Sequence, residues 1–429
     1  MPASAGRVLM LVENCFPADA RVRNEAFTLT QDGFRISVIA LRGAREPWRE
    51  TVNGVAVYRV PRLTLFKKLP GRGGFYLIRL LRSLSAVAGY AFEYCYFTGA
   101  CLMVSLYVAA REGFDVIHAH NPPDTLFVVG AIHRAFGRRF VFDQHDLSPE
   151  LYLSRYGKRQ HGLVSRSLMV LERLSLKLAD VVIVTNESYR SLAQTRHSID
   201  SSRLVVVRNG PNLKRVKPTA PDTALRTKAE TILGYVGAMN PQDGIDYLLR
   251  ALHHLRHDLG RKDFYCVLIG EGDSRQELEA LAHELGLGGH VWFTGFIPDQ
   301  DMLRYLSTAD ICLDPNPSSP LNDVSTWIKV MEYMALEKPI VSFDLKETRI
   351  SAGDAALYVR PNDEPAFARA IAQLMDDPAL RSALAQHGRR RVHEELNWAV
   401  TSRNLSAAYR RLFAPPAAEA ALDHISRDR

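Results

Sequence analysis

The segment from residue 322 to residue 344 reads NDVSTWIKVMEYMALEKPIVSFD. It predicts a loop, a short helix with an apolar face, a helix end at Pro339 and a buried strand over 340–343. Glu332 lies inside that helix, between apolar neighbours. Nucleotides bind α/β sheets at the carboxyl ends of the strands, where a carboxylate can accept hydrogen bonds from two ribose hydroxyls. Glu332 is therefore a candidate ribose ligand, and the alternative is a surface ion pair with Lys329 one turn earlier.

Short β-branched runs alternate with helical patterns along the chain, which is typical of parallel sheets covered by helices on both faces. The chain has 429 residues, which is too long for one typical hydrophobic core. The alternation stops at a polar stretch and then restarts. We therefore expect an α/β protein with two Rossmann-like domains, over 1–212 and 229–395. A linker over 213–228 would join them, and a helix and tail over 396–429 would follow.

The expected elements can be given by residue number. The strands are 8–12, 36–41, 55–60, 116–119, 140–142, 181–185 and 204–207 in the first domain, and 231–236, 264–269, 291–294, 311–313 and 340–343 in the second. The helices include 20–32 and 163–179 in the first domain, and 245–257, 274–285, 299–309, 328–336, 364–375 and 378–395 in the second. A last amphipathic helix is expected near 398–412.

Composition and charge limit the kinds of partner. The chain has 47% hydrophobic and 24% charged residues, as soluble globular proteins do, and a net charge of +7. That charge favours an anionic partner: a phosphorylated substrate, a membrane surface or nucleic acid. Nucleic acid is disfavoured, since no basic stripe interleaves with aromatic residues. The five cysteines lack metal-ligand or redox spacing, and the N-terminus lacks the apolar core of a signal peptide, so we expect a cytoplasmic protein.

One apolar stretch interrupts the first domain. From residue 84 to residue 110 the only charged residue is Glu93, and five Lys and Arg residues lie between 67 and 82. The length suits a membrane-spanning helix, but a span would put the strands on either side of it across a bilayer from each other. We expect instead that residues 65–110 lie on an anionic membrane as a basic, amphipathic segment. The alternative is a buried helix pair.

Three consecutive strand ends in the second domain carry glycine or exposed backbone. Glycine allows a ligand to approach the backbone closely, and the helix after each turn offers unpaired N–H groups to a phosphate. Because these strand ends share one edge of the sheet, they predict a single ligand lying across it. The candidate contacts are Gly237 and Gly244 after the first strand, Gly270 and Gly272 after the second, and the backbone of Phe296 and Ile297 after the third.

Histidines follow two strands of the first domain. His118 and His120 are candidate metal ligands, but no further Cys or His nearby completes a set, so we expect no metal. His145 and Asp146 follow the next strand, at a position suited to binding a sugar or a polar acceptor. The alternative for His145 is a strand-end histidine satisfied by its own protein.

Taken together, these segments resemble the family 4 retaining glycosyltransferases with the two-domain GT-B fold, over nearly the whole chain. The resemblance is carried by GYVG at 234–237, GEG at 270–272, FTGFIP at 293–298, AD at 309–310, EYMALEKP at 332–339 and FDQH at 142–145. The subgroup that it most resembles builds bacterial surface polysaccharides, often on lipid-linked acceptors. The resemblance implies a central cleft between the two domains and a C-terminal helix that crosses back toward the first.

The resemblance also implies roles for individual residues. The first domain would bind the acceptor and the second a nucleoside-diphosphate sugar, with Glu332 on the ribose and Asp323 and Ser325 as further donor contacts. His145 would contact the transferred sugar near its reacting centre, with Asp146 beside it. The turn at Gly237 and the helix after Gly244 would face the diphosphate. No cofactor and no metal would be needed.

Three positions depart from the family pattern. Family members carry an Arg and a Lys on the diphosphate where this chain has Ala238 and Asp243, and a carboxylate where it has Val324. A close cation contributes about 4 kcal/mol at an effective dielectric near 20, whereas a helix terminus contributes only about 0.3–2 kcal/mol. We hypothesise that Lys329 supplies the missing charge, with Arg21 and Arg23 of the first domain as further phosphate contacts. The alternative for these two arginines is a solvated helix face.

The sequence thus predicts a retaining glycosyltransferase that moves a sugar from a nucleoside diphosphate to a lipid-linked saccharide acceptor. The enzyme is expected to associate peripherally with the inner face of the cytoplasmic membrane. Two alternatives remain open. One is a nucleotide-sugar epimerase or phosphorylase of the same fold, against which the basic apolar segment argues. The other is a non-catalytic partner subunit, which the missing cations and carboxylate would explain.

Overall fold

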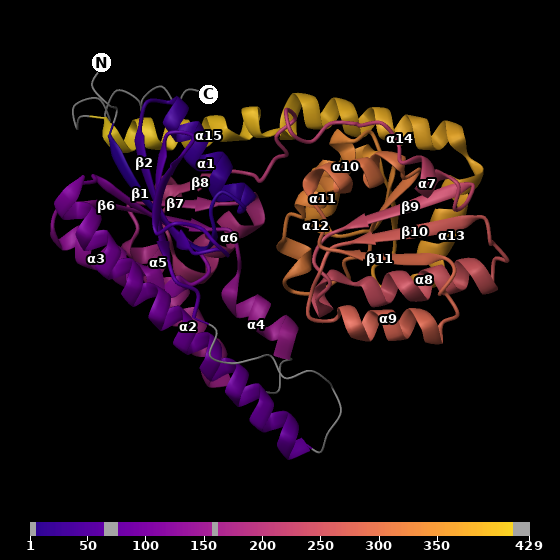
Figure 1. Ribbon diagram of the computed structural model, residues 1–429, viewed down its shortest axis with the longest axis horizontal. Coiled ribbons are helices and arrows are strands. Elements are labelled where there is room, and N and C mark those ends of the chain that lie inside the picture. The colour runs from indigo at the N-terminus through magenta and orange to yellow at the C-terminus, as the bar shows by residue number, and fades with distance from the viewer. Residues whose placement is uncertain (1–5, 64–75, 157–161, 415–429) are drawn as a thin grey trace. The chain divides into compact units, whose positions relative to one another are not determined.

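The computed structural model describes residues 6–63, 76–156 and 162–414, and side chains within 76–87 and 155–156 are not described (Figure 1). The chain divides into two compact units. One comprises Met1–Val207 with Ser402–Arg429, and the other comprises Arg208–Thr401. Every strand expected from the sequence is present, and each unit contains one sheet with helices on both of its faces. The expected linker, 213–228, is part of the second unit and contains a short helix, α7 (Thr223–Arg226).

The first unit is built on an eight-stranded sheet in the order β3-β4-β2-β1-β5-β6-β7-β8. Neighbouring strands are parallel except for the hairpin β3–β4. The strands are β1 (Arg7–Cys15), β2 (Arg35–Leu41), β3 (Arg49–Val52), β4 (Val55–Val60), β5 (Val116–His120), β6 (Arg139–Gln144), β7 (Val181–Val184) and β8 (Leu204–Val206). The helices are α1 (Ala20–Gln31), α2 (Tyr76–Arg111), α3 (Phe127–Ala135), α4 (Ser148–Tyr156), α5 (Gly162–Leu178) and α6 (Glu187–His197).

The order of the strands decides which face each helix covers. Right-handed crossovers place helices on opposite faces when the chain moves in opposite directions along the sheet. The chain moves one way from β1 to β2 through α1, and the other way from β4 to β5, from β5 to β6 and from β6 to β7. Helices α2, α3 and α5 therefore share one face, and α1 lies on the other. Figure 1 shows α2 as the longest helix of this unit.

The second unit has a six-stranded parallel sheet in the order β11-β10-β9-β12-β13-β14. The strands are β9 (Thr231–Val236), β10 (Phe264–Ile269), β11 (Val291–Gly295), β12 (Ile311–Asp314), β13 (Ile340–Phe343) and β14 (Ala356–Val359). The helices after α7 are α8 (Ile245–His257), α9 (Arg275–Glu284), α10 (Asp299–Thr308), α11 (Ile328–Ala335), α12 (Lys346–Ala352), α13 (Glu364–Asp376) and α14 (Pro378–Arg391). A reversal of strand order beside β9 and β12 marks the position where such sheets bind ligands.

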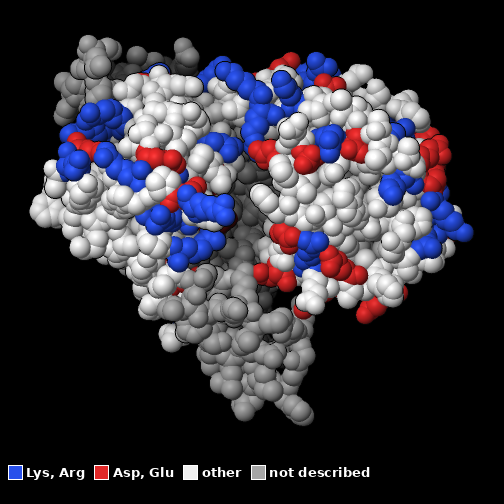
Figure 2. Space-filling view, viewed as in Figure 1, with Lys and Arg blue, Asp and Glu red and all other residues white. Residues whose placement is uncertain are grey.

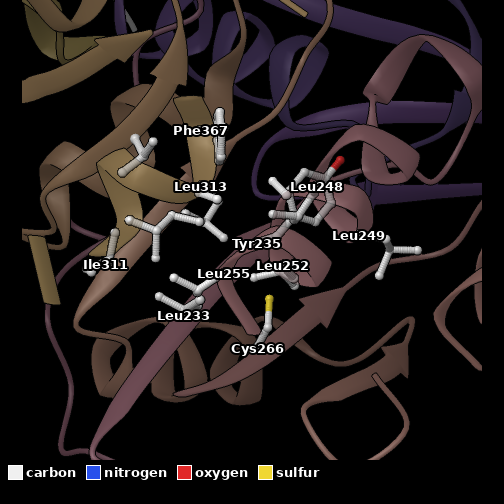
Figure 3. Close-up of a cluster of buried hydrophobic side chains, with 14 of the residues drawn as sticks. Leu233, Tyr235, Leu248, Leu249, Leu252, Leu255, Cys266, Ile311, Leu313 and Phe367 are labelled. Carbon is white, nitrogen blue, oxygen red and sulfur yellow. The ribbon is translucent and has the colours of Figure 1, made fainter. Parts of the chain in front are cut away.

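Hydrophobic cores fill both faces of the second sheet. Figure 3 shows the core between the sheet and α8, in which Leu248, Leu252 and Leu255 pack against Leu233 and Cys266. The leucines recur every three or four residues, so one stripe of α8 faces the strands. The opposite core contains Met331, Met334 and other apolar residues of α11, which fixes the helix that carries Glu332.

The last helix, α15 (Trp398–Phe413), returns to the first unit, as expected. Tyr409 lies 2.9 Å from His118 Nδ1, and the ring of Phe413 packs 5.3 Å from that of Phe34. Two details differ from the expectation. Strands β3 and β14 were not expected, and the apolar stretch of the first unit is one long helix, α2, where the alternative reading had a helix pair.

Candidate functional site

The glycine turns after β9 and β10 lie against each other. Gly237 has φ +153° and Gly270 has φ +138°, and a Cβ on Gly270 would lie 1.9 Å from the carbonyl oxygen of Gly237. A Cβ on Gly272 would lie 2.4 Å from the carbonyl oxygen of Met239, whose N–H donates to the carbonyl of Glu271 at 3.0 Å. These glycines are therefore required by the close packing of two turns, and that packing also leaves the backbone bare at the carboxyl edge of the sheet.

The loop after β12 completes this edge. A Cβ on Gly244, at the start of α8, would lie 2.1 Å from the carbonyl oxygen of Pro315. The side-chain amides of Asn316 and Asn322 donate to the carbonyl of Gln242 at 3.3 and 2.9 Å. These two asparagines were not singled out from the sequence. Their hydrogen bonds connect the loop after β12 to the predicted phosphate-facing turn before α8.

Glu332 lies on α11 and is partly buried. The pKa of Glu332 is raised, mainly by burial. The charge of Arg215 lowers this pKa and the charge of Asp299 raises it. The alternative reading, a surface ion pair with Lys329, is wrong, because the side chain of Lys329 is buried and turns toward Asp314. Glu332 is thus a carboxylate held by a well-packed helix, with no described ion pair to Lys329.

Lys329 lies under the turn that follows β9. Its Nζ is 3.5 Å from both the Tyr235 hydroxyl and Asp314 Oδ1, and 4.6 Å from the centroid of the Tyr235 ring. The Tyr235 hydroxyl donates to the carbonyl of Ala238 at 2.8 Å. The Lys329 ammonium is therefore connected through the Tyr235 hydroxyl to Ala238, the position at which the family pattern has an arginine. Asp314 is a buried counter-ion, so part of this charge is already neutralised.

The remaining donor-site candidates differ in exposure. Asp323 accepts a hydrogen bond from Ser318 at 3.1 Å, and Ser325 is buried and donates to the carbonyl of Leu321 at 2.8 Å. Phe296 follows β11 with 86% of its side chain exposed, whereas Ile297 packs partly against the core. Their proposed donor contacts stay predictions.

A second group of polar residues is buried in the first unit, between β5, β6 and α1. Arg21 of α1 binds Asp143 with two hydrogen bonds, from Nε at 2.6 Å and from Nη2 at 2.8 Å, and also lies 3.2 Å from Glu25. His120 Nδ1 is 3.0 Å from Asp143 Oδ2, and the ring of His118 stacks on that of His120 with centroids 4.2 Å apart. We call Arg21, Glu25, His118, His120 and Asp143 the buried polar cluster.

Arg21 lies in this cluster and not on a solvated helix face. Its side chain is only 5% exposed, so the solvated helix face is wrong for this residue, and its guanidinium is bound to Asp143 and to the carbonyl of Val207 at 3.1 Å. A group held in this way is not placed to bind a diphosphate from solvent. Arg23 is partly buried and donates to the carbonyl of Pro17 at 3.0 Å; its role as a phosphate contact stays a prediction.

His145 follows β6 at the rim of the buried polar cluster. Its Nδ1 lies 3.7 Å from Asp143 Oδ2. Burial lowers the pKa of His145, but the negative charges of Asp143 and Asp146 favour the protonated ring, and the net pKa is raised. The backbone N–H groups of His145 and Asp146 both donate to Asn121 Oδ1, at 2.9 and 3.1 Å. Asn121, which sequence reasoning did not assign a role, therefore fixes the backbone on which His145 is carried.

Four members of the cluster have metal-ligand chemistry. One ligand atom from each of Glu25, His118, His120 and Asp143 lies within 4.8 Å of the others. The sequence argument considered only Cys and His as further ligands, and it did not foresee the two carboxylates that join the histidines here. The cluster does not favour a metal, however. The guanidinium of Arg21 binds both oxygens of Asp143 and would repel a cation, and burial together with the charge of Asp143 raises the pKa of Glu25 well above its usual value.

Chelation tests this assignment. Dialysis against EDTA is expected to leave the melting temperature and the rate of sugar transfer unchanged, because the guanidinium of Arg21 already compensates the charge of Asp143. Differential scanning fluorimetry and a transfer assay, each with and without added Mg²⁺, Mn²⁺ or Zn²⁺, make the measurement. Activity that is lost with chelator and restored by one of these ions would contradict the assignment.

Comparison with known proteins identifies both halves of the chain. Residues 18–210 match the family described as "Glycosyl transferase 4-like domain", and residues 230–377 match "Glycosyl transferases group 1". An uncharacterised glycosyltransferase of Methanocaldococcus jannaschii is 24% identical over 86% of this chain and 88% of its own length. The lipopolysaccharide core biosynthesis glycosyltransferase LpsE of Rhizobium meliloti is 32% identical over 35% of this chain and 42% of its own.

Solved structures show the same fold. Sucrose-phosphate synthase of Thermosynechococcus elongatus superposes with a TM-score of 0.72 at 21% identity, over 95% of this chain and 99% of that one. HepE of Anabaena, solved in complex with UDP-glucose, superposes with a TM-score of 0.67 at 17% identity, over 94% and 98%. The two matched domains and this fold together identify the chain as a glycosyltransferase of the family 4 type with the GT-B fold.

Proposed function

We propose that this glycosyltransferase transfers a sugar, with retention of anomeric configuration, from a nucleoside diphosphate to a saccharide carried on a lipid. The observation that supports the donor most directly is the combination of Glu332 on α11 with the glycine turns at the carboxyl edge of the second sheet. This edge lies at a topological switch point, where nucleotides bind α/β sheets. HepE, which shares the fold, has been solved with UDP-glucose, and that supports a nucleotide-sugar donor here.

In the proposed reaction, the bond between the anomeric carbon and the diphosphate oxygen breaks, and its electron pair leaves on the diphosphate. The acceptor hydroxyl oxygen bonds to the same face of that carbon, and its proton leaves on the departing phosphate. The protein contributes by electrostatics and positioning. The N–H groups at the α8 N-terminus face the diphosphate beside the turn at Gly237, and Lys329 adds positive charge from beneath the turn.

His145 is assigned contact with the transferred sugar, and Asp143 is assigned the positioning of His145. The Nδ1 atom of His145 faces Asp143 Oδ2, which leaves Nε2 as the nitrogen available to a ligand. Arg21 and His120 hold Asp143 in place. A carboxylate behind a histidine fixes both its ring orientation and its tautomer.

The acceptor and the cellular role are inferred from chemistry and likeness. LpsE is named for lipopolysaccharide core biosynthesis, which supports a role in making a cell-surface polysaccharide. The net charge of +7 and the long apolar helix α2 support an acceptor held at an anionic membrane, with the enzyme on its cytoplasmic side. Within the described residues, the stretch Ala88–Arg111 is long and apolar enough to cross a bilayer, although part of it is buried.

The role of Lys329 gives a direct test of diphosphate stabilisation. Lys329→Met is expected to lower kcat by about tenfold to a thousandfold, because a close cation contributes up to about 4 kcal/mol and Asp314 already neutralises part of its charge. The variant leaves buried Asp314 without its counter-ion, so Lys329→Met/Asp314→Asn serves as a control that removes both charges. The double variant should recover the melting temperature without recovering kcat. Unchanged kcat and donor affinity in Lys329→Met would refute the role.

Calorimetry with several nucleoside diphosphates tests the proposed function as a whole. We expect one base to bind with micromolar affinity and the Glu332→Gln variant to bind it more weakly, while Glu284→Gln, an exposed glutamate on α9, binds like the wild type. A nucleotide that binds without being hydrolysed or transferred would favour a non-catalytic subunit. A protein that binds none of them would contradict the proposal.

A further inference from the structure

Large hydrophobic side chains are exposed mainly on one layer of helices. Of the fourteen such side chains among the described residues, nine lie on α2, α3 and α5 or at their ends. Large apolar patches of this kind on a soluble protein usually mark a surface that is covered by a partner or by a membrane. Because these residues lie together on three helices of one unit, we expect a single partner or surface to cover them.

Helix α2 has two distinct faces from Ala88 onward. Phe97, Cys101 and Val108 are buried in the first unit. The opposite stripe contains Phe92 and Cys95, then Met103 and Leu106 about two to four turns later, and has no charged residue; Met103 is 68% exposed. From Phe92 to Leu106 the stripe runs for about 21 Å at 1.5 Å per residue. Since one face is packed against the protein, α2 cannot be surrounded by lipid, and it suits a position along a surface.

Helix α5 combines apolar and basic residues on its exposed side. Leu163, Val170 and Leu174 are exposed, and Arg166, Arg173 and Lys177 are exposed at the same helical spacing. The one acidic residue of α5, Glu172, is buried and bound to Arg196 and His197. This side of α5 is therefore a basic amphipathic face, the pattern of helices that lie on anionic lipid.

The two helices belong to one layer. Both α2 and α5 contact α3, and the crossovers put all three on the same face of the sheet. Figure 2 shows more Lys and Arg than Asp and Glu on the visible side of the first unit. We call the exposed sides of α2, α3 and α5 the outer helical face.

We propose that the outer helical face docks on an anionic bilayer, with the uncharged stripe of α2 in the headgroup region and the basic residues of α5 on acidic lipid headgroups. A second copy of the chain is a weaker fit. In a two-fold symmetric dimer the same patch meets itself. The described part of this face has no exposed acidic side chain, since Glu172 is buried and Glu93 is half-buried, so the cations of α5 would lack opposite charges to pair with. The inference deepens the proposed function, since it names the surface that would bring the enzyme to a lipid-carried acceptor.

Vesicle binding of the full-length protein tests the proposal. Flotation with phosphatidylcholine vesicles and with phosphatidylcholine–phosphatidylglycerol vesicles should show stronger binding to the anionic ones. Arg166→Gln/Arg173→Gln/Lys177→Gln should weaken binding to anionic vesicles roughly a hundredfold, at about fivefold per basic side chain. Met103→Glu/Leu106→Glu should weaken binding to both kinds of vesicle by about tenfold or more. The matched control is Leu259→Glu/Ile350→Glu, in the second unit at 40% and 42% exposure, which should bind as the wild type does.

Each outcome decides the proposal. Equal binding to both vesicles, or binding unchanged in the α2 variant, would overturn it. So would light scattering that shows an oligomer converted to a monomer by the α2 variant, since the face would then be a protein interface. Circular dichroism confirms that each variant is folded. Nucleotide binding measured without vesicles should be the same in all of them, so failure of membrane docking is distinguished from failure of the proposed donor site.

Discussion

Glu332→Gln is expected to lower kcat/KM for the nucleotide sugar by about a hundredfold. The ionised carboxylate is proposed to accept hydrogen bonds from both ribose hydroxyls, and a bond to a charged group contributes about 1.5–3 kcal/mol. Glutamine keeps one acceptor and loses the charge, so a loss of about 3 kcal/mol is expected. Steady-state kinetics with the donor varied makes the measurement, and Glu332→Ala should be more severe.

The stability of the same variant separates binding from folding. Burial raises the pKa of Glu332, so the folded protein disfavours its ionised form. Replacing it with a neutral isostere should therefore leave the melting temperature at neutral pH unchanged or slightly higher. Kinetics equal to those of the exposed-site variant Glu284→Gln would show that Glu332 does not hold the donor. A large drop in melting temperature would show that it has a structural role instead.

Arg21→Met is expected to destabilise the fold by about 3–5 kcal/mol, since it leaves the buried carboxylate of Asp143 without its cation. Chemical denaturation at neutral pH measures this difference. Arg23→Met is the matched control, two residues along the same helix and only partly buried, and it should cost less than about 1 kcal/mol. The double variant Arg21→Met/Asp143→Asn, which removes both charges, should recover much of the loss.

The pH dependence of this effect follows from Asp143. Burial raises the pKa of Asp143, but the charge of Arg21 together with His120 and His145 outweighs burial and holds that pKa well below its usual value. A carboxyl whose pKa is lower in the folded state stabilises the fold above its unfolded-state pKa of about 4, and this contribution is lost as the pH falls through the folded-state pKa. The difference between wild type and Arg21→Met should therefore shrink in acid. A difference that is constant from neutral pH to pH values near 3 would contradict the assigned ion pair.

The fold could be predicted because its signals are local. Strands such as β5, β10 and β13 are short apolar or β-branched runs, and α8 shows its buried leucines at helical spacing. The two strands that were missed have weaker signals, because both lie at the edge of their sheets and are only partly buried: β3 reads RETV and β14 reads ALYV. The glycines after β9 and β10 were recognised, but the sequence could not show that each is required by the neighbouring turn.

The buried polar cluster could not be predicted, because its members meet only through the tertiary fold. Arg21 and Asp143 are 122 residues apart. Helix α1 buries Arg21 and Glu25 beside Val22, Ala26 and Leu29, so a reading that assigns charged residues to solvent puts these two on the wrong face. A signal for Asp143 did exist. It lies two residues before His145, and alternate residues of a strand point the same way.

The measurement that tests the account most directly is a crystal structure of the protein soaked with the nucleoside diphosphate that calorimetry selects. The account predicts density along the glycine-lined carboxyl edge of the second sheet, with both ribose hydroxyls within hydrogen-bond distance of the Glu332 carboxylate and the phosphates against the turn at Gly237 and the start of α8. An empty edge, with the nucleotide bound elsewhere on the chain, would contradict it.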